Sequence, residues 1–188
     1  MPNFLLDIDK ALFQVLNGQL VSTPTDFLFP ILTSIHIIWP VYILLAFYLI
    51  YTHRAKGIYA LLSLAMVLGI MDQMSTHVLK PWFNRQRPCR QETEIRLLIP
   101  CGPGQSFPST HAINNACLAI FLSMLFSSLR VPILIFAFLI SYSRIYVGVH
   151  YPLDVLGGMI IGAVFGYISA MTFKYVLNQN EKQKHIIT

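Results

Sequence analysis

Long apolar runs alternate with short polar segments along most of the chain. Five runs are long enough and poor enough in charge to cross a bilayer as helices, and they cover residues 27–52, 57–79, 109–128, 131–149 and 153–173. The first run contains Pro30, His36 and Pro40, so a short re-entrant helix followed by a shorter span would raise the count to six. The pattern predicts an all-α, polytopic membrane helix bundle of five or six spans, with residues 1–188 forming a single domain.

The N-terminal segment has a different pattern, in which apolar side chains recur at the spacing of one helix face. That face comprises Phe4, Leu5, Ile8, Leu12, Val15 and Leu16. Polar residues, among them Asp7, Lys10 and Gln14, lie opposite. This amphipathic pattern is typical of a helix that lies in the membrane interface, and we expect one over residues 1–20. It does not resemble a secretory leader, because Asp7 and Asp9 precede Lys10 where a leader would be basic.

Composition supports the membrane assignment and narrows the choice of partners. Apolar residues make up 55% of the 188 residues and charged residues only 11%, against roughly 25% in soluble proteins. The same values exclude disordered, collagen-like and disulfide-dense chains. The net charge of +5 does not indicate nucleic acid, because the 13 Lys and Arg residues are scattered among apolar runs. We expect a phosphorylated lipid and the bilayer as partners, and a monomer or weak dimer.

One long polar segment, residues 80–108, separates the predicted spans. Counting crossings places it on the same side of the membrane as the turn at 144–152 and opposite the tail at 174–188. Positive charges are nearly balanced between the two sides of the membrane. If Lys80, Arg87 and Arg144 are left out of the count as ligand-binding residues, the positive-inside rule favours an extracytoplasmic loop and a cytoplasmic tail. Cys89 and Cys101 lie in this loop, and their spacing leaves both a disulfide and two free thiols open.

Small residues recur every fourth position in the last predicted span, at Gly158, Gly162, Gly166 and Ala170. Such a ridge lets two helices approach closely. We expect an internal helix contact here in preference to a dimer contact.

Three polar clusters stand at span boundaries on the same predicted membrane face. They are Lys80 with Arg87 and Pro88, then Pro108-Ser109-Thr110-His111, then Ser143 and Arg144 with His150 and Asp154. Each supplies groups that phosphoryl transfer needs, because cations and backbone amides can hold and neutralise a phosphate dianion. The cations are Lys80, Arg87 and Arg144. Ser109 precedes a helix, so its hydroxyl and the amides of Thr110 and His111 form an anion site at the helix N-terminus.

The two histidines of these clusters have different expected roles. Asp154 follows His150 at i+4, so its carboxylate is expected to accept from one ring nitrogen and leave the other free to attack phosphorus. His111 would protonate the departing oxygen as a general acid. The expected intermediate is a phosphohistidine, which His111 would then help to hydrolyse as a base.

Other functions remain open on the residues alone. A two-metal phosphatase would need several carboxylate or histidine ligands, and the polar loop offers only Glu92 and Glu94, so we expect no metal and no cofactor. A lipid phosphotransferase would use the same nucleophile with a different acceptor. A non-enzymatic anion or lipid carrier would need the cations but not the pairing of His150 with Asp154.

The three clusters resemble the sequence pattern of the type 2 phosphatidic acid phosphatase superfamily, which includes bacterial acid phosphatases, glucose-6-phosphatase and vanadium haloperoxidases. That pattern is Lys, six residues, Arg-Pro; then Pro-Ser-Gly-His; then Ser-Arg, five residues, His, three residues, Asp. It occurs in order from Lys80 to Asp154, about 40% of the chain. Thr110 replaces the usual glycine, and we expect its side chain to narrow the pocket and make catalysis slower or more selective.

The resemblance implies a metal-independent integral-membrane lipid phosphatase with His150 as nucleophile, Asp154 as its partner and His111 as acid and base. It implies phosphate binding by Lys80, Arg87, Ser109, Thr110 and Arg144. It further implies a site on the outer face of the bacterial inner (cytoplasmic) membrane. Undecaprenyl diphosphate, phosphatidylglycerophosphate, phosphatidate and lipid A phosphate are the candidate substrates, and the sequence does not choose among them.

Overall fold

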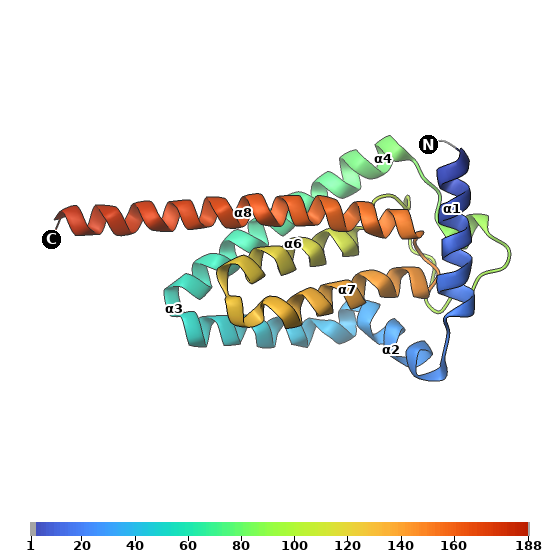
Figure 1. Ribbon diagram of the computed structural model, residues 1–188, viewed down its shortest axis with the longest axis horizontal. Coiled ribbons are helices and arrows are strands. Elements are labelled where there is room, and N and C mark those ends of the chain that lie inside the picture. Colours follow the sequence, from blue (N-terminus) through green and yellow to red (C-terminus); the bar gives the residue numbers. More distant parts are fainter. Residues whose placement is uncertain (1–2, 188) are drawn as a thin grey trace.

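The computed structural model describes residues 3–187, which contain helices and loops but no strand (Figure 1). The α-helices are α1 (Asn3–Gln14), α2 (Thr23–Thr33), α3 (Ile35–Met74), α4 (Lys80–Phe83), α5 (Pro88–Gln91), α6 (Thr110–Leu125), α7 (Arg130–Tyr146) and α8 (Pro152–Ile187). π-Helical turns extend α1 over Val15–Gln19 and α3 over Ser75–Leu79, and a 3₁₀ turn covers Ser127–Leu129. The all-helical prediction is confirmed. The first two residues of the predicted interfacial helix and the last residue of the predicted tail lie outside the described residues.

Three helical segments of the described chain are long and apolar enough to cross a membrane: His36–Gln91, Ser127–Tyr146 and Pro152–Asn180. α6 is a shorter apolar helix of 16 residues. These helices support an integral membrane protein, whereas the number of spans stays a prediction. The first predicted apolar run is divided at Ser34, where the backbone leaves the helical region between α2 and α3.

α3 is bent into two arms at Arg54, whose φ of 47° and ψ of −125° are not helical. The chain reverses direction there, so the arms form two separate legs of the bundle (Figure 1). Next to the bend the arms meet closely, because a Cβ at Gly57 would lie only 2.2 Å from the carbonyl oxygen of Leu49. Glycine therefore allows the tight reversal.

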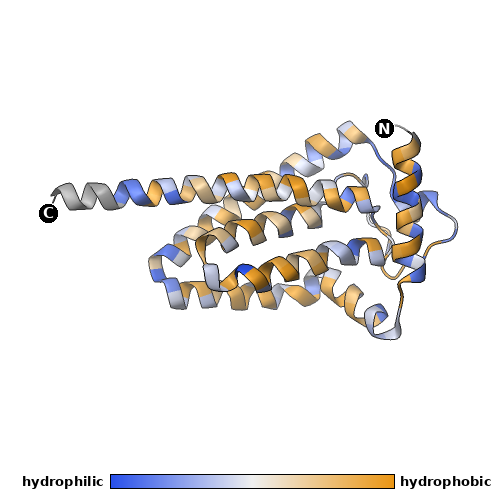
Figure 2. Ribbon diagram, viewed as in Figure 1, coloured by the Kyte–Doolittle hydropathy of each residue, from blue (hydrophilic) through white to orange (hydrophobic). Residues whose placement is uncertain are grey.

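The hydropathy of the residues changes along the long axis of the bundle. Figure 2 shows apolar residues along the middle of the helices and hydrophilic residues near the bend of α3, towards the C-terminal part of α8, and in the loops beside α1. Large apolar side chains such as Phe47, Tyr51 and Val131 are exposed on the outer surface. An apolar surface of this extent suits contact with lipid and would be unusual on a soluble monomer.

α8 packs directly on α6 through the ridge of small residues. A Cβ at Gly162 would lie 2.2 Å from the carbonyl oxygen of Ile113, and a Cβ at Gly166 would lie 2.5 Å from that of Cys117. The ridge therefore makes an internal contact, as predicted. Close packing also aligns the starts of the two helices, so that the Ser109 amide donates to the Asp154 carbonyl oxygen at 3.0 Å.

Gly162→Leu is expected to force α6 and α8 apart and to destabilise the protein by about 1–3 kcal/mol or more, the usual scale of overpacking. The measurement is thermal unfolding in detergent. Gly69→Leu is the matched control on α3, because a Cβ at Gly69 meets no atom within 4 Å. Equal melting temperatures for the two variants would contradict the tight α6–α8 contact.

Candidate active site

The three polar clusters meet around one cavity, at the end of the bundle where α1 and the long loop lie (Figure 1). Each predicted site residue lies at or next to the end of a helix. Lys80 starts α4, Arg87 precedes α5, and Ser109, Thr110 and His111 lie at the start of α6. Arg144 is in the last turn of α7, His150 lies in the turn before α8, and Asp154 is in the first turn of α8. Chain segments far apart in sequence thus converge on one place.

A cavity of about 750 Å³ reaches these clusters from the interior of the bundle. Its polar end includes Lys80, Arg87, Thr110, His111, Arg144 and His150. Its other walls are largely aliphatic, with Leu45, Leu61, Leu64, Leu68, Leu118 and Leu122 from α3 and α6. The remaining two predicted site residues, Ser109 and Asp154, are fully buried and do not line the cavity. The cavity therefore has a cationic end and an aliphatic interior.

The imidazole of His150 is held in a defined tautomer. Its Nε2 lies 3.1 Å from Nη1 of Arg87, and because a guanidinium only donates, Nε2 must accept and carry no proton. The ring proton is then on Nδ1, which faces the Ser106 hydroxyl at 3.3 Å. Burial lowers the pKa of His150 to about 4, so the ring is neutral near pH 7.

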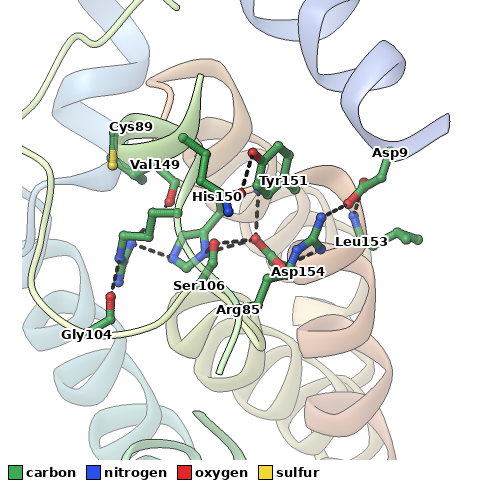
Figure 3. Close-up of polar contacts among 12 residues, drawn as sticks. Asp9, Arg85, Cys89, Gly104, Ser106, Val149, His150, Tyr151, Leu153 and Asp154 are labelled. Carbon is green, nitrogen blue, oxygen red and sulfur yellow. Dashed lines mark hydrogen bonds and ion pairs between the residues drawn. The ribbon is translucent and has the colours of Figure 1, made fainter. Parts of the chain in front are cut away.

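Asp154 lies beside His150 as expected, but the Ser106 hydroxyl stands between them, so the two residues make no direct hydrogen bond. The Asp154 Oδ2 atom lies 3.6 Å from Nδ1 of His150, beyond a direct hydrogen bond. The Ser106 hydroxyl donates to the same Oδ2 atom at 2.5 Å and is placed to accept from Nδ1 (Figure 3). Sequence reasoning missed Ser106, because it lies outside the three clusters and only its nearness to Pro108 could have drawn attention to it.

The Asp154 carboxylate is buried, and hydrogen bonds fix both of its oxygens. Oδ2 also accepts from the Tyr151 amide at 2.8 Å. Oδ1 accepts from Nη1 of Arg85 at 2.8 Å. Arg85 lies between Lys80 and Arg87 in the sequence, but its position there gave no sign of this pairing.

A disulfide joins Cys89 and Cys101, with their Cα atoms 6.0 Å apart, and decides the alternative that the sequence left open. The bond holds the following loop beside Arg87, whose Nε donates to the carbonyl oxygen of Gly104 at 3.3 Å. A further bond at 3.4 Å joins Nη2 of Arg87 to the carbonyl oxygen of Pro103. The loop thereby fixes the guanidinium against His150.

Two buried donors near the cavity have no hydrogen-bond partner among the described residues: Nε of Arg144 and the hydroxyl of Ser109. Nη1 of Arg144 is held by the hydroxyl of Thr33 on α2. Buried polar groups are normally paired, so unpaired donors beside a cationic cavity are suited to an anionic ligand. Thr110 lines the cavity, with its hydroxyl 3.0 Å from that of Ser75.

A sequence model described as the PAP2 superfamily matches residues 56–178, about two thirds of the chain. The chain belongs to the PAP2 superfamily. The matched region contains all three clusters and the cationic end of the cavity, whereas α1 and α2 precede it.

Several relatives of this PAP2 protein are named as phosphatases of membrane lipids. The lipid A 4'-phosphatase of Bacteroides thetaiotaomicron is 36% identical over 178 residues, which cover 89% of this chain and 78% of that protein. The undecaprenyl-diphosphatase BcrC of Bacillus subtilis is 35% identical over 106 residues, covering 55% of this chain and 53% of that protein. The crystal structure of Aquifex aeolicus LpxE superposes with a TM-score of 0.68 at 29% identity, covering 86% of this chain and 94% of that one.

Proposed function

We propose that this PAP2 protein removes phosphate from a membrane lipid through a phosphohistidine intermediate and without a metal. The observation that carries the proposal is the cavity, in which three cations and two histidines line one end and leucines line the interior. The cationic end suits a phosphate, and the aliphatic walls suit the hydrocarbon chain attached to it. The lipid phosphatases among its relatives support the same activity.

Substrate binding would place the phosphate among Lys80, Arg87 and Arg144. Arg87 would transfer its hydrogen bond from Nε2 of His150 to a phosphate oxygen, which releases the ring's lone pair for attack. The unpaired Nε of Arg144 and hydroxyl of Ser109, with the amides at the start of α6, would complete the anion site. The cations would then stabilise charge as the leaving oxygen departs.

In the first step Nε2 of His150 forms a bond to phosphorus while the bond from phosphorus to the lipid oxygen breaks. His111, on the same cavity wall, would give its proton to that oxygen. In the second step His111 would take a proton from water, whose oxygen attacks phosphorus and breaks the P–N bond. Inorganic phosphate leaves, and both histidines return to their starting states.

Ser106 and Asp154 would support the ring as it gains positive charge. The chain Nδ1–H to Ser106 hydroxyl to Asp154 carboxylate lets the buried negative charge stabilise the phosphorylated imidazolium. Arg85 and the Tyr151 amide hold that carboxylate in place.

Ser106→Ala is expected to lower kcat roughly 10- to 100-fold, because Asp154 loses its link to the ring while the three cations stay in place. KM should change little. Steady-state kinetics of phosphate release measure both values, and Ser127→Ala, in the 3₁₀ turn before α7, is the matched control. A wild-type kcat in Ser106→Ala would remove Ser106 from the mechanism.

The lowered pKa of His150 predicts that its imidazole stays neutral from pH 8 down to about 5, because protonation of the buried ring sets in only near 4. An ordinary histidine would titrate near 6.5. Nitrogen-15 histidine NMR of the detergent-solubilised protein can follow the ring, with the His150→Gln spectrum identifying its signals. A midpoint near 6.5 would contradict this prediction.

Among the candidate substrates we place lipid A phosphate first. The lipid A 4'-phosphatase matches 89% of this chain, whereas the undecaprenyl-diphosphatase matches 55%. Undecaprenyl diphosphate, phosphatidylglycerophosphate and phosphatidate are the competing substrates. The disulfide between Cys89 and Cys101 supports a site on the outer face of the inner membrane, since disulfides persist outside the reducing cytoplasm.

The deciding experiment is phosphate release from each of these four lipids by purified protein in detergent, with EDTA present. We expect release from lipid A phosphate at the highest kcat/KM, no effect of EDTA, and no release by His150→Gln. Release only after an acceptor lipid is added would show a phosphotransferase. Lipid binding without release, unchanged in His150→Gln and lost in Lys80→Ala, would show a carrier.

A further inference from the structure

Helix α1 buries a carboxylate against the candidate active site. Asp9 is fully buried, although its neighbours Phe4, Ile8 and Leu12 on the same helix are exposed. Its Oδ1 atom accepts from the Leu153 amide at 2.8 Å, and its Oδ2 atom accepts from Nη2 of Arg85 (Figure 3). Both carboxylate oxygens of Asp9 are therefore hydrogen-bonded to groups near the start of α8 and are not solvated.

Arg85 connects this carboxylate to the one behind His150. One nitrogen of its guanidinium pairs with Asp9, and the other donates to Oδ1 of Asp154 at 2.8 Å. The group also lies 4.3 Å above the ring of Tyr151, and its side chain is only 12% exposed. The planar guanidinium of Arg85 is held by a carboxylate at each of two nitrogens and by an aromatic ring on one face, so its orientation is fixed. The position of Asp154 is therefore tied to α1 through Arg85.

Packing holds α1 in register with this contact. The rings of Phe13 and Tyr151 pack edge to face with centroids 5.3 Å apart. One helical turn further, Nδ2 of Asn17 donates to the carbonyl oxygen of Tyr146 at 2.7 Å. The buried face of α1 and of the π-helical turn that extends it thus comprises Asp9, Phe13 and Asn17, at i, i+4 and i+8. This face contacts both ends of the turn that carries His150.

We propose that Asp9 is a positioning residue for phosphoryl transfer, which acts through Arg85 on the Asp154 carboxylate. The inference rests on the proposed phosphatase function. Shared between two carboxylates, the Arg85 charge neutralises Asp154 only in part, so that Asp154 keeps negative charge for the imidazolium of His150. Without Asp9, Arg85 pairs with Asp154 alone, which weakens that stabilisation and frees the guanidinium to shift. α1, which precedes the matched family region, is then part of the working site.

Asp9→Asn tests the proposal with little change of shape. The asparagine oxygen can still accept from the Leu153 amide, whereas its NH₂ group meets Arg85 as donor against donor. Asp7→Asn is the matched control, because Asp7 lies on the same helix and is exposed. We expect kcat to fall roughly 10- to 100-fold in Asp9→Asn, with KM within about twofold of the wild type, and no change in Asp7→Asn.

The double variant with Arg85→Gln separates positioning from general destabilisation. If Asp9 acts through Arg85, Asp9→Asn adds no further loss of kcat in the Arg85→Gln background. If the loss of kcat in the double variant equals the product of the losses in the two single variants, the proposal is overturned. A kcat for Asp9→Asn equal to that of Asp7→Asn would overturn it as well. All rates are divided by the amount of monodisperse protein from gel filtration, so that a folding defect does not count as a loss of kcat.

Asp9→Glu keeps the charge and supplies a second test should Asp9→Asn fail to fold. We expect it to retain more activity than Arg85→Gln, and an equal or greater loss of kcat would overturn the proposal. The wild-type assay separates the two hypotheses. An inactive wild type would refute the proposed function, whereas an active wild type with an indifferent Asp9 would refute only this inference.

Discussion

Replacing His150 by glutamine is expected to lower kcat by roughly 10⁶-fold, to below detection, because an amide cannot replace the imidazole proposed to form the covalent bond to phosphorus. Glutamine fills similar space and keeps polar atoms near Arg87 and Ser106, so the variant should still fold and bind lipid phosphate. The measurement is a single-turnover assay with phosphorus-32-labelled lipid, in which the wild type should form a labelled protein that is labile in acid and stable in alkali.

His77→Gln is the matched control for this variant. His77 lies in the π-helical turn before Lys80, is exposed, and does not line the cavity. It should keep wild-type turnover and label fully. Label on His150→Gln, or turnover within tenfold of the wild type, would show that the nucleophile is another group.

His111→Ala is expected to cost roughly 10²- to 10⁴-fold in kcat for a natural lipid phosphate, whose alkoxide leaves poorly without a proton. The loss should be much smaller in the first step for an aryl phosphate, whose leaving group needs no acid. Because we propose that His111 also acts as base in the second step, the variant should accumulate labelled protein with the aryl substrate. Comparison of burst size and steady-state rate on both substrates measures the two roles separately.

Equal losses on lipid and aryl phosphates in that comparison would argue against the acid role of His111. They would indicate instead that the residue only binds phosphate beside Arg144, with which it shares the cavity wall. His77→Ala serves as the control here as well, since it removes a histidine outside the cavity.

Helix positions were predictable because the apolar runs that determine them are local in sequence. The runs at 57–79, 131–149 and 153–173 correspond closely to the second arm of α3, to α7 and to the first part of α8. The ridge at Gly162 and Gly166 was likewise readable, because only a close partner helix explains small residues at every fourth position. A division of the first run was anticipated from Pro30, His36 and Pro40, but its position at Ser34 was not, because both prolines lie inside helices and do not mark the break.

The sequence also brought together the groups that we propose to bind and transfer phosphate, since span boundaries on one side of a bundle lie near one another. It did not find Ser106, Arg85 or Asp9, because their partners lie 44 to 144 positions away. No spacing rule connects residues that meet only after helices have packed. The direct hydrogen bond expected between His150 and Asp154 is not formed, because the loop that carries Ser106 places its hydroxyl between them.

By itself, then, the chain determined a helical membrane protein, the family to which it belongs, and the end of the bundle where its cations and histidines gather. Only the tertiary structure decided that Cys89 bonds to Cys101, that the tautomer of His150 is set by Arg87, and that α1 reaches Asp154 through Arg85. Local patterns fix which segments become helices, because backbone hydrogen bonds and lipid contact act along the chain. Hydrogen bonds between side chains depend on ångström-scale distances, which are set only when α1, the loop at residues 84–108 and the starts of α6 and α8 have packed together.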